Sequence, residues 1–124
     1  MTKKREHLPE KLVDTIIEAL KDLKAVDIVS VDLKNVSGAV CKYFIICNGT
    51  SNTHVSALAD NVQEETLENL NEKVWRVEGK QNAQWVLLDY ADVVVHVFQK
   101  EYRDYYQLEQ LWADANITYI PNVH

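Results

Sequence analysis

The histidines are the first residues to consider for acid–base or metal chemistry, and the chain has four of them: His7, His54, His96 and His124. His96 lies within the apolar run Val93–Phe98, where a histidine is more often a hydrogen-bonded core residue than a general base. No second histidine stands at metal-ligand spacing from His96. His54 is expected in the first turn of a helix, where the helix dipole disfavours a cation. The histidines therefore predict neither a catalytic base nor a metal centre.

Two other patterns offer groups for phosphate or metal binding. Gly49-Thr50-Ser51 precedes a predicted helix, whose free N–H groups can bind phosphate, but no basic residue lies near it, which favours a turn with a helix N-cap. Asp89 and Asp92 are separated by a turn, so they do not share a strand face as a D-x-D metal-binding pair does. We predict no catalytic residue, no metal and no cofactor, and hence a protein that is not an enzyme.

Aromatic and acidic side chains are concentrated in the segment from Trp85 to Trp112, which points to partner binding. Three residues share one face of its first expected strand: Trp85, Leu87 and Asp89. Val86 and Leu88 occupy the other face and are suited to packing on a helix. A tryptophan, a leucine and a carboxylate on a rigid strand are typical of an interface hot spot. The same pattern also arises where a second layer of helices covers the tryptophan, and the strand pattern does not separate the two possibilities.

The charge distribution narrows the class of partner. The net charge is −6, and no Lys or Arg occurs between Tyr43 and Glu72. Within that stretch lie five carboxylates: Asp60, Glu64, Glu65, Glu68 and Glu72. Because Lys and Arg supply most of the affinity for phosphates, we expect no direct, sequence-specific binding of nucleic acid. If the partner is a ribonucleoprotein, the contact should be made with a basic protein.

The elements that position these residues predict a single α/β domain over residues 1–124. The expected helices are Pro9–Lys24, a helix from Ser51 to about Asn71, and Glu101–Ala115, the last with Tyr105, Leu108, Leu111, Trp112 and Ala115 facing inward. The expected strands are Ile28–Leu33, Tyr43–Cys47, Val74–Glu78, Trp85–Asp89 and Asp92–Phe98. We expect one mixed sheet of about five strands with helices on its faces, including a parallel crossover from Tyr43–Cys47 to Val74–Glu78. The basic start of the chain and the lack of a long apolar run predict a cytoplasmic protein without a membrane span.

The central motif resembles a known family. Residues 85–98 read W-V-L-L-D-Y-A-D-V-V-V-H-V-F, which is similar to the W-x-L-x-D-Y-G-D-V-V-V-H-V-F core of the ribosomal silencing factors of the Iojap family. Residues 101–115 continue the family pattern E-x-R-x-x-Y-x-L-E-x-L-W-x-x-A, and residues 43–51 resemble its Y-F-V-I…G-T-S element. The chain departs from the pattern at Lys42, where the family usually has an aspartate, and at Ala91, where it usually has a glycine.

This resemblance implies a fold similar to the nucleotidyltransferases without their activity. It also implies a translational repressor that binds large-subunit ribosomal protein number fourteen and blocks joining of the ribosomal subunits when nutrients are short, and that forms a homodimer. The expected partner-binding residues, carried over one by one, are Trp85, Leu87, Asp89, Tyr90 and Asp92. Two alternatives stay open: a residual nucleotidyltransferase-like enzyme, and a dimeric adaptor for a non-ribosomal protein.

Overall fold

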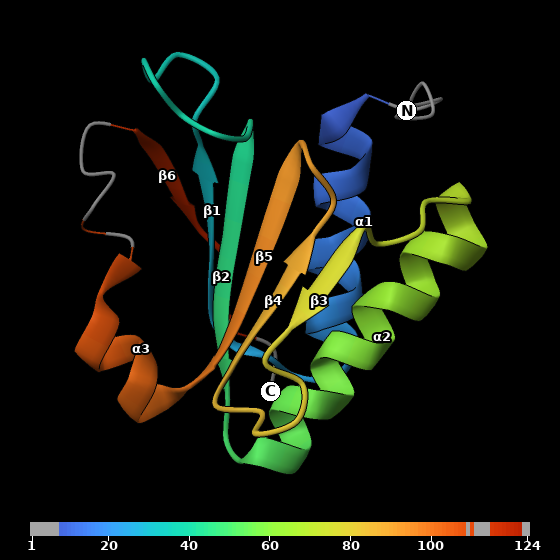
Figure 1. Cartoon of the computed structure of the whole chain (residues 1–124), viewed down its shortest axis with the longest axis vertical. Coiled ribbons are helices and arrows are strands. Elements are labelled where there is room, and N and C mark those ends of the chain that lie inside the picture. The colour runs from blue at the N-terminus through green and yellow to red at the C-terminus, as the bar shows by residue number, and fades with distance from the viewer. Residues whose placement is uncertain (1–7, 109, 111–114, 123–124) are drawn as a thin grey trace.

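In a computed structural model of the chain, which describes residues 8–108, 110 and 115–122, one sheet separates two layers of helices (Figure 1). The sheet has six strands in the order β3-β4-β5-β2-β1-β6. The strands are β1 (Val26–Asp32), β2 (Tyr43–Gly49), β3 (Arg76–Glu78), β4 (Trp85–Asp89), β5 (Val93–Gln99) and β6 (Asn116–Tyr119). Two helices, α1 (Pro9–Asp22) and α2 (Asn52–Leu70), cover one side of the sheet, and α3 (Lys100–Tyr106) lies on the other. The expected α/β class with a mixed sheet is confirmed.

The sheet topology corrects two expectations. Only the β2–β5 pairing is parallel among the strands described, so β2 and β3 run in the same direction but with β5 and β4 between them. The crossover through α2 therefore skips two strands instead of joining neighbours. The sixth strand, β6, was not expected; it pairs with β1 at the edge of the sheet, where the nearby Pro121 leaves the ladder intact.

Helix α2 has a capping residue at each end, whereas α1 ends at Asp22, two residues earlier than expected, and α3 is much shorter than expected. Ser51 caps α2 by accepting a hydrogen bond from the His54 N–H, and Asn71 ends the helix in a left-handed conformation. Gln107 ends α3 in the same way, after seven residues, so the expected helix Glu101–Ala115 is too long. Tyr105, expected to face inward, is instead 80% exposed. The expected inward positions Leu111 and Trp112 lie outside the described residues.

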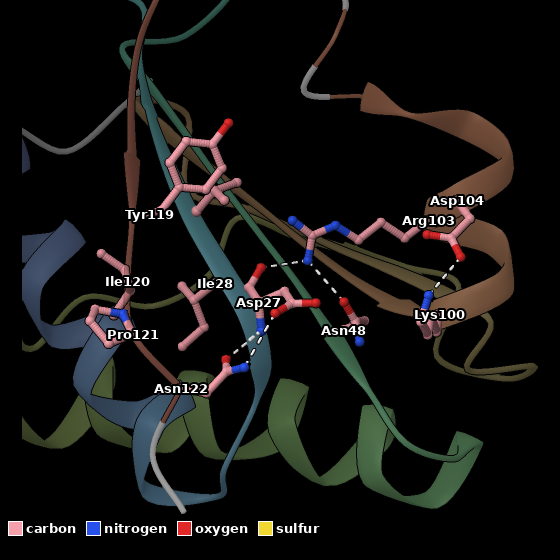
Figure 2. A pocket seen from close by; sticks show the side chains of 11 residues that line it. Asp27, Ile28, Asn48, Lys100, Arg103, Asp104, Tyr119, Ile120, Pro121 and Asn122 are labelled. Atoms are coloured by element: carbon pink, nitrogen blue, oxygen red, sulfur yellow. Dashed lines mark hydrogen bonds and ion pairs between the residues drawn. The ribbon is translucent and has the colours of Figure 1, made fainter.

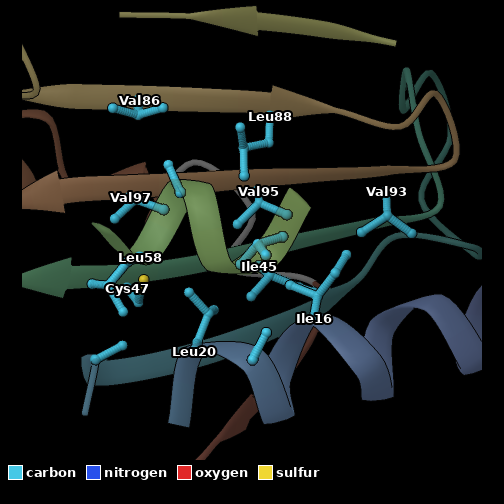
Figure 3. Packing of buried hydrophobic residues seen from close by; sticks show 14 of the residues in the cluster. Ile16, Leu20, Ile45, Cys47, Leu58, Val86, Leu88, Val93, Val95 and Val97 are labelled. Carbon is cyan, nitrogen blue, oxygen red and sulfur yellow. The ribbon is translucent and has the colours of Figure 1, made fainter. Parts of the chain in front are cut away.

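One side of the sheet packs on α1 and α2 and forms what we call the helix-side core. Figure 3 shows residues from β2, β4, β5 and both helices meeting there, among them Ile16, Leu20, Ile45, Cys47, Leu58, Val86, Leu88, Val93, Val95 and Val97. Most of these side chains have no exposed surface. Burial raises the pKa of the Cys47 thiol to about 12, so this cysteine behaves as a small apolar residue, as its place in an apolar strand predicts.

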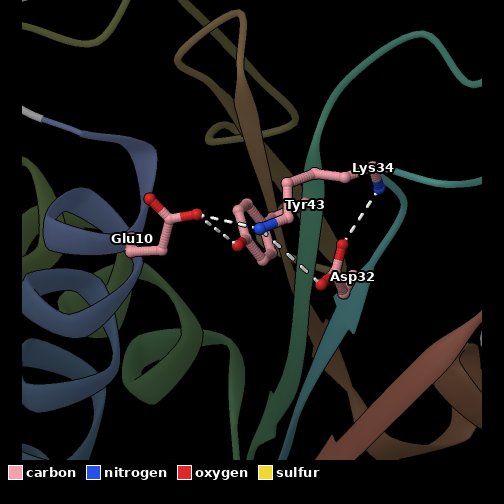
Figure 4. Close-up of polar contacts among 4 residues, drawn as sticks. All are labelled: Glu10, Asp32, Lys34 and Tyr43. Carbon is pink, nitrogen blue, oxygen red and sulfur yellow. Dashed lines mark hydrogen bonds and ion pairs between the residues drawn. The ribbon is translucent and has the colours of Figure 1, made fainter.

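A polar cluster of four residues joins the start of α1 to the end of β1 and the start of β2 (Figure 4). The Glu10 carboxylate accepts hydrogen bonds from the Lys34 ammonium at 3.0 Å and from the Tyr43 hydroxyl at 2.9 Å. The Lys34 backbone N–H donates to the Asp32 carboxylate at 2.9 Å. The hydrogen bond from Lys34, the largest of several causes, lowers the pKa of Glu10 to about 2. The chain that leaves β1 and the start of β2 are thus both attached to α1.

Candidate functional site

The side of the sheet opposite α1 and α2 carries a surface that we call the aromatic face. It is formed by Phe44, Trp85, Leu87, His96, Phe98 and Tyr106. Strand alternation places Trp85 and Leu87 of β4 on this face and Val86 and Leu88 in the helix-side core, as expected. Trp85 and Leu87 are half-buried, because α3 covers only part of the face. They are therefore accessible on a rigid strand next to a buried apolar layer.

Three aromatic contacts and one hydrogen bond hold the Trp85 indole. Its ring stacks on Phe98 with centroids 4.9 Å apart and lies 4.8 Å from Tyr106 of α3 and 5.8 Å from the His96 ring. Its Nε1–H donates to His96 Nδ1 at 3.0 Å. A side chain with this many fixed neighbours loses little further entropy when a partner binds, which favours an interface anchor.

His96 is a buried strand residue, as expected, and 5% of it is exposed. Because the Trp85 indole is only a donor, His96 Nδ1 must accept, and its proton therefore sits on Nε2. Nε2 finds no hydrogen-bond partner among the described residues. Burial lowers the pKa of His96 to about 4, so the ring is neutral at pH 7. It serves as an acceptor for Trp85 and not as a base.

Asp89 lies at the end of the same strand face, but its carboxylate is used within the chain. Its Oδ1 accepts the Ala91 N–H at 2.8 Å and its Oδ2 lies 3.5 Å from the Arg76 guanidinium. Ala91 has a φ of +72°, and the Asp92 N–H donates to the Tyr90 carbonyl at 2.9 Å. The turn expected between Asp89 and Asp92 is thus a γ-turn, supported by the Asp89 carboxylate. The main role of the Asp89 carboxylate is therefore to fix the turn at the end of the aromatic face. Its charge is offset by Arg76.

Tyr90 and Asp92, the remaining expected contact residues, occupy different positions. Tyr90 is 3% exposed and belongs to the helix-side core, where its hydroxyl lies 2.8 Å from the Thr66 hydroxyl of α2. It is on the wrong side of the sheet to join Trp85 in one contact. Asp92 is partly buried, and its carbonyl accepts from the N–H groups of Lys42 and Tyr43. The structure brings Trp85, Leu87 and Asp89 together and separates Tyr90 from them.

The five carboxylates between Tyr43 and Lys73 also lie away from the aromatic face. These carboxylates belong to α2 and the turn after it, and α2 covers the other side of the sheet (Figure 1). One of them, Asp60, is paired with Lys80. The acidic helix and the aromatic face therefore cannot meet the same small surface of a partner.

The patterns considered for catalysis have structural roles here. Ser51 is the N-cap of α2, and His54 Nδ1 accepts the Thr50 N–H at 2.9 Å while its Nε2 lies 2.7 Å from the Leu23 carbonyl of the α1 C-cap. Among the described residues, no group of three or more His, Cys, Asp or Glu side chains is placed to hold a metal. In the same part of the chain, no helix combines the length and apolarity that crossing a bilayer requires.

Comparison with known proteins decides the family. The family model described as RsfS, ribosomal silencing factor during starvation, matches residues 5–124. The chain belongs to the ribosomal silencing factor family. A ribosomal silencing factor RsfS from Bacillus subtilis is 45% identical over 97 residues, which cover 78% of this chain and 80% of that protein. Another from Halalkalibacterium halodurans is 41% identical over 106 residues, covering 86% of this chain and 89% of that protein.

A solved structure extends the comparison to three dimensions. The crystal structure of a protein from Chromobacterium violaceum is similar to this silencing-factor chain with a TM-score of 0.81 and 36% sequence identity, over 86% of this chain and 88% of that one. The family resemblance read from residues 85–98 is confirmed by these findings.

Arg103 is the structural residue of this family member that sequence reasoning missed. It is a buried charged side chain whose Nη1 donates to Asn48 Oδ1 at 2.9 Å and to the Asp27 carbonyl. It thereby ties α3, and with it Tyr106, to β2 and to the start of β1. The family pattern E-x-R marks the residue, but no local spacing relates position 103 to positions 27 and 48.

Proposed function

We propose that this protein represses translation by binding the large ribosomal subunit and preventing the small subunit from joining it. The partner on the large subunit is its basic ribosomal protein number fourteen. The observation that supports this most is the placement of Trp85 and Leu87, which are accessible on β4 in a chain whose relatives are named ribosomal silencing factors. A cytoplasmic location follows from such a role.

In this proposal, Trp85 and Leu87 form the centre of the contact and Asp89 maintains its shape. Tryptophan is among the residues that contribute most to binding energy, and it does so best when it is held in one orientation. The stacking on Phe98 and the hydrogen bond to His96 hold it so. We leave Tyr90 out of the contact because it is buried on the opposite side, and we place Asp92 at the margin.

The test of the activity is a sucrose-gradient experiment with separated ribosomal subunits. With the protein at saturating concentration, we expect subunits that normally associate to remain separate. If joining is unchanged at saturation, the anti-association role is wrong. A protein that binds neither subunit but retains another protein in a pull-down would instead be the dimeric adaptor.

The test of the site is a pair of tryptophan variants. Trp85→Ala should weaken binding to the large subunit by about 2 kcal/mol or more, the loss typical of a hot-spot residue. Trp75→Ala is the matched control, because Trp75 is 71% exposed and its ring packs on Arg76, whereas the Trp85 ring packs on Phe98 and Tyr106. Circular dichroism verifies the fold of both, and Leu87→Ala provides a second variant of the site. Equal binding by the Trp85 and Trp75 variants would place the contact elsewhere.

We extend the proposal to a homodimer, which the family resemblance implies. The exposed parts of Trp85 and Leu87 supply apolar area that a second copy of the chain can cover. Analytical ultracentrifugation as a function of concentration measures this directly. A monomer at high micromolar concentration would contradict it without affecting the proposed ribosome binding.

A further inference from the structure

The two parallel strands at the centre of the sheet send the chain to opposite sides. From β2 the chain enters α2 on the helix side, and from β5 it enters α3 on the side of the aromatic face (Figure 1). In open α/β sheets, such a change of side leaves a crevice beyond the carboxyl ends of the strands, and ligands bind there. Here Asn48 marks the end of β2, and Lys100 and Arg103 follow β5 directly.

A cavity of about 480 Å³ opens at this point, between α3 and the edge of the sheet. This volume is in the range of small-molecule sites. Figure 2 shows Arg103 reaching from α3 toward β1 and β2, with Tyr119, Ile120 and Pro121 on the opposite side. The Arg103 guanidinium and the Asn48 amide are both buried and are joined by a hydrogen bond of 2.9 Å. Two polar groups of the cavity wall are thus fixed before any ligand enters.

Charges of both signs line the cavity. Arg103 and Lys100 supply cations on the α3 side. Asp27 supplies a carboxylate on the β1 side. The Asn122 side chain fixes this residue, because its Oδ1 accepts the Asp27 backbone N–H at 2.8 Å and its Nδ2 donates to the Asp27 Oδ1 at 3.3 Å. Asp104 balances Lys100, with their charged groups 2.8 Å apart. A ligand with both an anionic and a cationic group would meet charge of the opposite sign on both sides of the cavity.

Apolar groups form the remaining wall of the cavity. Ile28, Tyr119, Ile120 and Pro121 lie along it, on β1, on β6 and just beyond β6. They offer a surface for a ring or a branched aliphatic group next to the charged pair. Such a combination, a few polar groups with fixed positions beside an apolar wall, is usual for small-molecule sites.

We propose that this cavity binds a small zwitterion, an α-amino acid with an aromatic or branched side chain. Its carboxylate lies toward Arg103 and Lys100, its ammonium group toward Asp27, and its side chain against Tyr119 and Pro121. This site is separate from the aromatic face and does not depend on the proposed ribosome binding.

The experiment is a titration of the ¹⁵N-labelled full chain with L-phenylalanine, followed by NMR. Phenylacetate and phenethylamine, which each carry one of its two charges, are titrated in parallel. We expect saturable shifts at Asn48, Tyr119 and Asn122, and an affinity for phenylalanine about tenfold higher than for either single-charge compound. No saturable shift up to about 10 mM phenylalanine would overturn the proposal. Phenylacetate binding as tightly as phenylalanine would also overturn it, because the site would then recognise an anion alone.

A charge-neutral variant tests the ammonium side. Asp27→Asn keeps the size of the side chain and suits the left-handed conformation at this position, where φ is +51°. We expect it to weaken phenylalanine binding about tenfold and to leave phenylacetate binding unchanged. Asp14→Asn, on the exposed side of α1, removes the same charge far from the cavity and should change neither. If the two variants bind phenylalanine equally well, Asp27 does not receive the ammonium group and the proposal fails.

Discussion

The two sides of the sheet differ in how completely helices cover them, although they share the same strands. On the helix side, α1 and α2 have 14 and 19 residues, and Val86, Leu88 and Val95 are fully buried. On the other side, α3 has seven residues, and Trp85 and Leu87 remain half-buried. On the same face, Phe98 and His96 of the neighbouring β5 are buried, so the partial exposure belongs to β4, which lies one strand from the edge of the sheet. A strand that reads as apolar on both faces can still present one of them to a partner.

The two sides also differ in how their buried polar groups are satisfied. In the helix-side core, the Tyr90 hydroxyl meets the Thr66 hydroxyl, which also donates to the Val62 carbonyl. On the aromatic face, His96 has one hydrogen-bonded nitrogen, and its other nitrogen has no partner among the described residues. A buried N–H group without a hydrogen-bond partner lowers the free energy of unfolding. Burying His96 as the acceptor for the Trp85 indole therefore has a cost in stability.

Neighbouring leucines on β4 give the sharpest test of the difference between the sides. Leu88→Ala should lower the free energy of unfolding by about 3 kcal/mol, because it leaves a cavity in the helix-side core. Leu87→Ala should cost about 1 kcal/mol, since its side chain is already partly in water. Urea denaturation of both variants measures the contrast. Equal losses would mean that the aromatic face is as closed as the helix-side core.

Acid should weaken the aromatic face through His96. Its pKa is about 4 in the folded chain against an ordinary value of 6.5. Because the pKa of His96 is lower in the folded chain than in the unfolded chain, the neutral ring's contribution to the free energy of unfolding is complete above pH 6.5. This contribution is lost as the pH falls toward 4. The difference corresponds to about 3 kcal/mol. His96→Gln retains an acceptor for the Trp85 indole without a titrating ring, so its unfolding free energy should lose less between pH 7 and pH 4.5. Parallel losses in the two proteins would show that His96 does not titrate in this range.

The strand faces of this chain could be read from its sequence, because alternation is a local signal. Trp85 and Leu87 were expected opposite Val86 and Leu88, and they are. The burial of His96 was equally predictable from its apolar neighbours. For the site, the sequence left open whether a helix layer covers Trp85, and the structure answers that α3 covers it in part.

The errors arose where the outcome depends on distant or single-residue effects. The strand β6 forms because β1, far away in the sequence, offers it an edge, and no local pattern encodes that pairing. The end of α3 depends on Gln107 adopting a left-handed conformation. Glycine or asparagine usually occupies such a position, so a glutamine gives no signal for the end of a helix. Tyr90 is different, because alternation from Val86 and Leu88 already places it on the helix side, where it lies, and its assignment to the contact came from the family resemblance alone.

The hydroxyl pair of the helix-side core offers a smaller effect to compare with His96. Thr66→Val should cost about 1 to 2 kcal/mol, because it removes a partner of the buried Tyr90 hydroxyl. Adding Tyr90→Phe should recover part of that loss, since both members of the pair are then apolar. A double-mutant cycle by urea denaturation gives the coupling. Additive losses would show that the two hydroxyls do not stabilise each other.

The turn between β4 and β5 provides the smallest effect and connects the two sides, because it follows Asp89 and contains Tyr90. Ala91 has a φ of +72°, a conformation that is unfavourable for alanine and open to glycine. Ala91→Gly should therefore raise the free energy of unfolding, by about 0.5 kcal/mol after the greater freedom of glycine in the unfolded chain is subtracted. Ala57→Gly, the same substitution at an exposed position within α2, is the control and should lower the free energy of unfolding by about 1 kcal/mol. If Ala91→Gly also destabilises the protein, the alanine is not strained, and the γ-turn is held by the Asp89 carboxylate at no cost to the backbone.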